Sequence, residues 1–232
     1  MTLAAQQRRP SRLDLVVPIV LSVVVAVTSY AASGVSLGFF FGPVLLAPIV
    51  VPPLALSVSK LSHRFAVCII YAGASGIVWL LAGRVEISAV VRCVIVLVAL
   101  VLALASLPPA LVRARFQPVL ASATVTILGL AWLTWPVWLA RALPTNGGEY
   151  VLRWAGPVNP LFAINGTLRS YFDDWDRYQL AYQHLTTLNQ DVLYSLPRSI
   201  WPSALAHLLI ALGCFILAMH FRTISPATAP QK

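Results

Sequence analysis

Six apolar stretches, each long enough to cross a bilayer, constrain this chain more than any motif does. A helix needs about 20 mostly apolar residues to cross the hydrocarbon core of a membrane. The stretches that meet this requirement are 15–32, 37–58, 65–83, 89–112, 118–141 and 203–221. Only 10% of the 232 residues are charged, whereas soluble domains carry about 25%. The sequence therefore predicts an all-α, polytopic membrane protein with six transmembrane helices.

The basic residues divide unevenly between the two sides that six spans define. Nine Lys or Arg residues fall on the side of the termini, against a single acidic residue, Asp14. The other side has seven Arg residues and six acidic residues. Because short cytoplasmic loops are rich in Lys and Arg, we expect both termini in the cytoplasm and the protein in the plasma (inner) membrane. This distribution also accounts for the net charge of +9, so we expect no nucleic-acid partner.

The spans divide the chain into five regions. We expect a cytoplasmic N-terminal arm, a five-helix transmembrane region, an external amphipathic segment, a sixth transmembrane helix and a cytoplasmic tail, over residues 1–14, 15–141, 142–202, 203–221 and 222–232 respectively. The first span also has the basic start, apolar core and small residues of a signal peptide. Its long apolar core favours a retained span, and cleavage would leave the remaining topology unchanged.

The span 37–58 contains an unusual number of prolines, namely Pro43, Pro48, Pro52 and Pro53. Each proline removes a backbone donor, and the freed carbonyls are tolerated at membrane depth only where neighbouring helices or a wet cavity satisfy them. We therefore expect this helix to be kinked and packed inside the bundle. The kink is either purely structural or the bend of a helix that moves during transport.

The external segment contains two amphipathic helical patterns. We expect Asn159 to cap a helix that begins at Pro160, because Asn accepts from free amides and Pro gives up a donor that has no partner there. The apolar stripe of this first helix is Leu161, Ile164, Leu168, Phe172 and Trp175. The stripe of the second is Ala181, Leu185, Leu188, Val192 and Leu196. Near-balanced charge and many aromatic residues predict two external interfacial or re-entrant helices between the fifth and sixth spans.

No motif supports a catalytic, cofactor-binding or metal-binding residue, so we expect no enzyme and no cofactor. Asp173, Asp174 and Asp176 have only His184 near them as a further ligand, which favours a solvated turn over a cation site. The run from Gly73 to Gly76 matches the G-x-S-G pattern of rhomboid intramembrane serine proteases, with Ser75 as nucleophile and His207 as its partner. Small residues also allow close helix packing, and packing is the favoured interpretation.

Two segments of the second half carry a resemblance to a known family. Residues 154–169, "WAGPVNPLFAINGTLR", join an apolar approach, Asn-Pro-Leu and a later Arg. Residues 103–136, "ALASLPPALVRARFQPVLASATVTILGLAWLTWP", join a small-residue helix end through a short basic turn to the next helix. Over residues 90–221 the chain resembles type-2 ABC transporter permeases, the membrane subunits of exporters. The resemblance implies six spans with both termini inside, and two short helices that dip into the external leaflet.

The resemblance also implies a function and partners. It predicts a permease subunit of an ABC-type exporter that moves an apolar or amphipathic substrate, forms a homo- or heterodimer in the lipid bilayer, and is energised by a separate ATP-binding-cassette ATPase subunit. The chain has no G-x-x-x-x-G-K-[ST] motif of its own. The candidate outer gate or substrate contacts are Asn159, Pro160, Asn165, Arg169 and Arg198.

An alternative function is a non-transporting membrane scaffold or accessory subunit of a membrane complex. Permeases of this family usually have a cytoplasmic stretch between the second and third spans that helps to engage the ATPase. This chain has only the short turn "SKLSHR", residues 59–64, in that place. The sequence leaves the substrate, the direction of transport and the oligomeric state open, and an intramembrane serine protease is the third hypothesis.

Overall fold

The computed structural model describes residues 20, 24, 27, 28, 37–58, 60–82, 85–139, 148–171 and 196–223, and this part of the chain is helical with short connections and no strand. The helices are α2 (Leu37–Ser57), α3 (Leu61–Ala82), α4 (Ile87–Arg113), α5 (Pro118–Leu139), α6 (Gly148–Ala155), α7 (Pro160–Leu168), the 3₁₀ turn η1 (Arg169–Tyr171) and α9 (Trp201–Thr223). Several expected features lie outside the described residues, namely most of the span 15–32, the acidic residues 173–176, His184 and most of the second amphipathic pattern.

Five of the described helices are long and apolar enough to cross a membrane: α2, α3, α4, α5 and α9. They correspond to the second through sixth of the expected spans, which confirms the multi-pass, all-helical membrane character of the described part. The bounds differ slightly from expectation, since α3 begins at Leu61 rather than at 65 and α9 at Trp201 rather than at 203.

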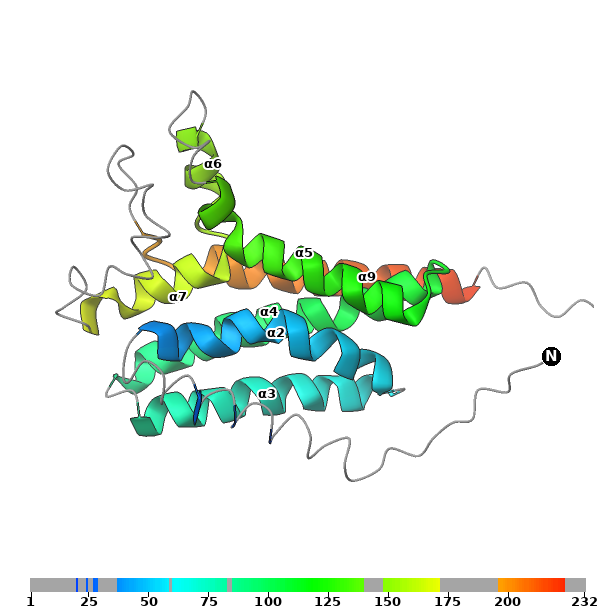
Figure 1. The fold of residues 1–232 in the computed structure, drawn as a ribbon, viewed down its shortest axis with the longest axis horizontal. Helices are drawn as coiled ribbons and strands as arrows, with labels where there is room; N and C mark the ends of the chain where they lie inside the picture. Colours follow the sequence, from blue (N-terminus) through cyan, green and yellow to red (C-terminus); the bar gives the residue numbers. More distant parts are fainter. Residues whose placement is uncertain are drawn as a thin grey trace, which may run out of the picture.

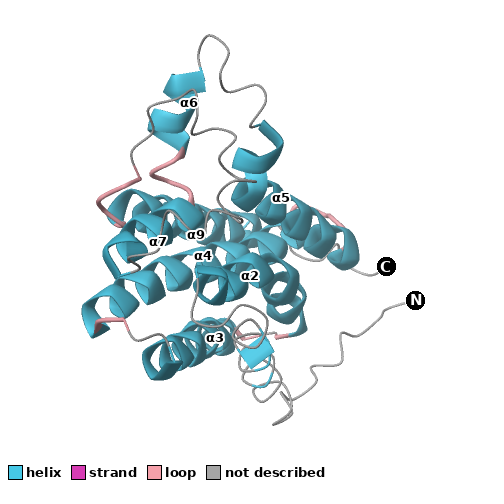
Figure 2. Ribbon diagram, turned by 60° about the vertical axis from the view of Figure 1, so that its left-hand side comes forward, coloured by secondary structure: helices cyan, strands magenta, loops and turns pink. Residues whose placement is uncertain are grey.

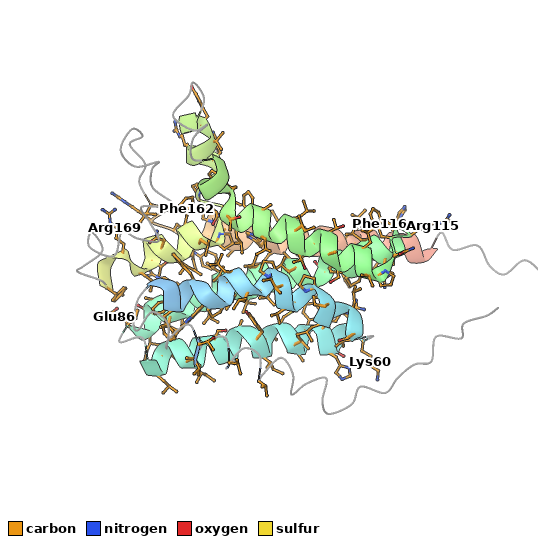
Figure 3. The ribbon with its side chains drawn as sticks, viewed as in Figure 1. Lys60, Glu86, Arg115, Phe116, Phe162 and Arg169 are labelled. Atoms are coloured by element: carbon orange, nitrogen blue, oxygen red, sulfur yellow. The ribbon has the colours of Figure 1, made fainter. Side chains whose placement is uncertain are left out.

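The five long helices lie side by side along the length of the molecule (Figure 1). Short connections join α2 to α3 and α4 to α5, so consecutive helices run in opposite directions. Lys60, Arg115 and Phe116 lie at one end of the bundle, and Glu86 and Arg169 lie at the other (Figure 3). These two ends are called the basic end and the Glu86 end below.

Helix α4 is at the centre of the bundle. It packs against α2, α3, α5, α7 and α9, and its buried residues lie on several faces along most of its length. Buried side chains make up 61% of the span in α2 and 56% of that in α4, against 22% in α5 and 28% in α9. Helices α2 and α4 therefore form the core, whereas α5 and α9 leave most of their apolar surface for lipid or for another protein.

The end of α4 is closed by a Schellman motif. The Phe116 N–H donates to the Leu111 carbonyl (3.1 Å) and the Arg115 N–H donates to the Val112 carbonyl (3.0 Å), the pair of bonds that defines this motif. Arg115 stands at the position where glycine is preferred, with φ at 71°. A left-handed conformation costs a residue with a side chain about 1–2 kcal/mol. Arg115 at this position therefore lowers the stability of the turn relative to glycine.

Side chains of neighbouring helices satisfy two of the four carbonyls that the prolines of α2 free. A proline removes the bond to the carbonyl four residues before it, so Pro43 frees the carbonyl of Phe39 and Pro52 frees that of Pro48. The Trp79 indole N–H of α3 donates to the Phe39 carbonyl (3.3 Å), and the Thr126 hydroxyl of α5 donates to the Pro48 carbonyl (2.8 Å).

Tyr71 of α3 forms a further hydrogen bond to α2, at a carbonyl that no proline frees because residue 47 is alanine. Its hydroxyl, which is buried in the core, donates to the Pro43 carbonyl (2.7 Å). The expectation that neighbouring helices satisfy the carbonyls of this helix is therefore confirmed at Phe39 and Pro48. Since the donors come from α3 and α5, the same bonds that satisfy α2 also fix its two neighbours against it.

Replacing Thr126 by Val tests this arrangement. Val has the shape of Thr but no donor, so Thr126→Val leaves the Pro48 carbonyl without a partner. We expect a loss of about 1–2 kcal/mol in unfolding free energy, measured by thermal or denaturant unfolding in detergent. The matched control is Thr134→Val, because the Thr134 hydroxyl donates only to the Leu130 carbonyl of its own helix. Equal losses in the two variants would contradict the role given to Thr126.

Candidate functional site

Helix α7 begins where the sequence predicts. Asn159 is its N-cap, and the Asn159 side-chain oxygen accepts from the Leu161 N–H (2.9 Å). Pro160 occupies the first helical position, where its missing N–H has no cost. The predicted cap is thereby confirmed, and it shows why these two residues stand together.

The other half of the Asn159 side chain reaches α5. Its Nδ2 donates to the Trp132 carbonyl (2.9 Å) and approaches that of Leu133 (3.4 Å). Pro136 removes the backbone N–H that would otherwise bond to the Trp132 carbonyl. Asn159 therefore caps one helix and satisfies a proline-freed carbonyl of another. At about 1.5 Å per residue, this contact lies about 10 Å from the end of α5 at Leu139.

Helix α7 is buried on almost all sides. Leu161, Ile164 and Leu168 of the expected stripe are buried, but so are Phe162 and Ala163 between them. The expectation of one apolar face and one polar face therefore describes α7 poorly. The reason is tertiary: α7 packs against α4 and α2, and the segment before α9 covers another side. A Cβ on Gly166 would lie 2.1 Å from the Pro197 carbonyl oxygen, so only glycine fits there.

Two aromatic contacts join α5 to α7 and α9. The rings of Trp135 and Phe162 meet edge to face with centroids 6.1 Å apart, and those of Trp132 and His207 lie 6.4 Å apart. Trp135 is buried. These two tryptophans thus hold the Glu86 end of the bundle together through the side chains of α7 and α9. We refer to this meeting of α5, α7 and α9 as the outer junction.

His207 and Ser75 are each hydrogen-bonded within their own helix. The His207 Nδ1 lies 2.7 Å from the Ser203 carbonyl, which can only accept, so Nδ1 carries the proton. The Ser75 hydroxyl donates to the Tyr71 carbonyl (2.9 Å). Their helices, α3 and α9, lie on opposite sides of α4 in both ribbon views (Figures 1 and 2). The arrangement does not bring the serine and histidine of the expected protease motif together.

Three buried polar atoms near the Glu86 end have no hydrogen-bond partner. They are Asn165 Oδ1 on α7, Ser203 Oγ on α9 and Trp135 Nε1 on α5. A buried polar group without a partner costs about 1–3 kcal/mol, so each is an unused acceptor or donor in an apolar surrounding. The residues of the outer junction can therefore form hydrogen bonds beyond those within the bundle.

Glu86 was not singled out by the sequence. It precedes α4, and its carboxylate accepts from the Tyr171 hydroxyl (2.9 Å) and the Ser88 hydroxyl (3.3 Å). The bond to Tyr171 ties η1, and with it the end of α7, to the start of α4. Nothing in the sequence signals this pair, because 85 positions separate its members.

The remaining candidate residues lie at the surface. Arg169 forms the C-cap of α7 and is exposed, as is Arg198 in the segment before α9. Of the five candidates, then, Asn159, Pro160 and Asn165 are buried and the two arginines are exposed. Within the described residues, no group of three or more His, Cys, Asp or Glu side chains could hold a metal ion.

Comparisons of the chain with protein-family models, curated proteins and solved structures found no match. The site must therefore be judged on its geometry. A short buried helix, held by one asparagine at its start and by one tyrosine after its end, lies beside unused hydrogen-bonding groups. Its position therefore depends on these two hydrogen bonds and on apolar packing against α2 and α4.

The double role of Asn159 can be tested with a mutant cycle. Asn159→Ala removes the cap, which is worth about 1 kcal/mol, and leaves the Trp132 carbonyl unpaired, which costs about 1–2 kcal/mol more. In a Pro136→Ala background the helix itself can supply that second bond. We therefore expect Asn159→Ala to destabilise the Pro136→Ala protein less, by about 1 kcal/mol, in thermal unfolding. An identical loss in both backgrounds would contradict the link to α5.

Proposed function

We propose that this protein is the membrane permease subunit of an ABC-type exporter, moving an apolar or amphipathic substrate with energy from a separate ATPase. The observation that carries the proposal is the insertion of α7 between the fifth and sixth expected spans, with its capped start about 10 Å inside the end of α5 and its body against α2 and α4. Short helices that dip into the external side at this place in the chain are what the resemblance to type-2 permeases implies.

The proposed orientation follows from charge. The basic end, with Lys60 and Arg115, faces the cytoplasm, and both termini lie there. The Glu86 end then faces outward, so the outer junction becomes the outer gate. In this orientation the protein resides in the plasma (inner) membrane as one of two permease subunits, with the exposed apolar faces of α5 and α9 available to lipid or to the second subunit.

Helix α6 has the character of an interfacial helix. It extends away from the bundle, roughly across the direction of the long helices, in both ribbon views (Figures 1 and 2). Its Tyr150 and Trp154 are 71% and 74% exposed. Tyr and Trp favour the boundary between membrane and water, so we place α6 along the outer boundary, where it anchors the segment that leads into α7.

The gate mechanism combines these elements. In the closed state the Tyr171–Glu86 bond holds η1 against α4, and Asn159 holds the start of α7 against α5. Opening breaks the exposed bond and lets η1 and the end of α7 move away from α4. The apolar side chains that this movement uncovers then contact the hydrophobic part of the substrate. The unpaired oxygen atoms of Asn165 and Ser203 accept hydrogen bonds from its polar part.

Partner purification tests the proposal as a whole. The full chain, expressed with its genomic neighbours, should co-purify with an ATP-binding-cassette ATPase. The complex in liposomes should then show ATP turnover that rises with an exported amphipathic compound and is lost when the ATPase lysine that binds the nucleotide phosphates is replaced. Purification of the chain without any ATPase, from cells that contain all candidate ATPases, would count against it.

The outer gate makes a sharper prediction. Tyr171→Phe removes the bond to Glu86, so it should favour the open gate and change substrate-stimulated turnover by up to about fivefold, the equivalent of about 1 kcal/mol. Glu86→Gln should have a smaller effect, because its amide oxygen still accepts from Tyr171. Tyr150→Phe, which removes an exposed hydroxyl from α6, is the matched control and should leave turnover unchanged. Turnover that is unchanged in Tyr171→Phe would rule out this bond as part of a gate.

One observation favours a second candidate, a non-transporting accessory subunit. The connections at the basic end are short, since α2 ends at Ser57 and α3 begins at Leu61, and α4 ends at Arg113 and α5 begins at Pro118. These short connections offer little surface to which an ATPase could bind. Stable co-purification with another membrane complex, with no ATPase in the preparation, would favour this candidate over the permease.

A further inference from the structure

Two arginines at the basic end are held in place by main-chain carbonyls. The Arg64 Nε donates to the Val58 carbonyl (2.8 Å), just after the end of α2. The Arg113 guanidinium donates through Nη1 to the Ala218 carbonyl of α9. Arg64 is half-buried and Arg113 is exposed. Each bond occupies one edge of a guanidinium group and fixes its position, while other N–H groups of both arginines remain for another acceptor.

Among the residues that the structure describes, the two arginines have no acidic partner at this end. No Asp or Glu occurs between residues 15 and 85 or between 87 and 148, and Glu86 lies at the opposite end of the bundle (Figure 3). Asp14 is outside the described residues and follows a stretch with three arginines. The end of α4 that carries Arg113 lies beside the start of α3 that carries Arg64, because these two helices pack against each other and run in opposite directions. Two positioned cations without a carboxylate among the described residues leave room for an external anion.

Neighbouring groups add to the attraction for an anion. His63, next to Arg64, has a buried Nδ1 with no hydrogen-bond partner, which can donate to an anion in the tautomer that carries the proton on this nitrogen. Both residues belong to the first turn of α3, whose N-terminus carries a partial positive charge. Lys60 lies just before this turn and is exposed. These groups support the site, but the two positioned guanidinium groups are the basis for it.

We propose that Arg64 and Arg113 form a binding site for a phosphate oxyanion, supplied by the headgroup of an anionic phospholipid in the leaflet at the basic end. A guanidinium matches the paired oxygens of a phosphate with two parallel hydrogen bonds. Both arginines stand at the ends of apolar spans, in the first turn of α3 and the last of α4, which is the depth of lipid headgroups. The site does not depend on the proposed transport function.

The lipid is favoured over an acidic protein partner by the position of the arginines. Arg64 is half-buried between helix ends, and the connections around it are short. A headgroup whose acyl chains lie along the apolar helices reaches such a place directly. A protein surface would have to enter between the helix ends and the membrane to form the same bonds.

The test uses the full chain in nanodiscs of phosphatidylcholine, with or without phosphatidylglycerol. Thermal stability and retained lipid, measured by native mass spectrometry, report on binding. We expect phosphatidylglycerol to stabilise the protein, and each of Arg64→Gln and Arg113→Gln to lower the retained phosphatidylglycerol about fivefold. Arg64→Lys and Arg113→Lys keep the charge but lose the paired geometry, and we expect them to bind at an intermediate level.

Arg115→Gly is the matched control. It removes the same charge from the same end of the bundle, and glycine suits the positive φ at this position. We expect it to retain phosphatidylglycerol as the unmodified protein does. A loss equal to that of Arg64→Gln would mean diffuse attraction to the basic end and would overturn the site.

Further measurements distinguish the possible sources of the anion. Inorganic phosphate is added to the protein in a lipid-free neutral detergent. Stabilisation by phosphate that disappears in Arg64→Gln would assign the site to a soluble phosphate and overturn the lipid. Unchanged lipid retention in the two Gln variants, together with loss of a co-purifying protein, would assign the arginines to a protein partner instead. A lack of response to both phosphatidylglycerol and phosphate would overturn the site altogether.

Discussion

The fold depends on one constraint, the need to satisfy carbonyls that proline frees inside apolar helices. Water is absent at that depth, so each unpaired carbonyl is costly and a neighbouring element must supply a donor. Trp79 does so for Phe39, and Thr126 for Pro48. Asn159 does so for Trp132. Each of these bonds joins two different elements, so the prolines that weaken individual helices also link α2 to α3 and α5, and α5 to α7.

The candidate site follows from the same constraint. Asn159 is required at the start of α7 and at the freed carbonyl of α5, so one side chain couples the short helix to a long one. The other attachment of this region, from Tyr171 to Glu86, is exposed and joins η1 to α4. In the proposed gate, the buried attachment at Asn159 is the point about which α7 turns. The exposed attachment at Tyr171 is the bond that breaks when the gate opens. This asymmetry is the physical basis of the proposed gate.

Charge distinguishes the two ends of the molecule in a related way. At the Glu86 end a carboxylate accepts from a neighbouring hydroxyl and closes the structure on itself. At the basic end Arg64 and Arg113 bond to carbonyls, and no carboxylate of the described part of the chain lies near them. The hydrogen bonds of Glu86 are formed within the protein, whereas Arg64 and Arg113 keep N–H groups that can bind an anion from outside it. The concentration of basic residues at one end thus leaves specific groups for the surrounding membrane.

Local patterns in the sequence were enough to predict the apolar helices and the start of α7 at Asn159 and Pro160, because span length and helix capping depend on adjacent residues. They also showed that the freed carbonyls of α2 would need partners. Only the tertiary structure decided which donors meet them, that α7 is buried on nearly all sides, and that Glu86 meets Tyr171. These contacts join residues far apart in the chain, and their positions depend on how the helices pack around α4, which no local pattern contains.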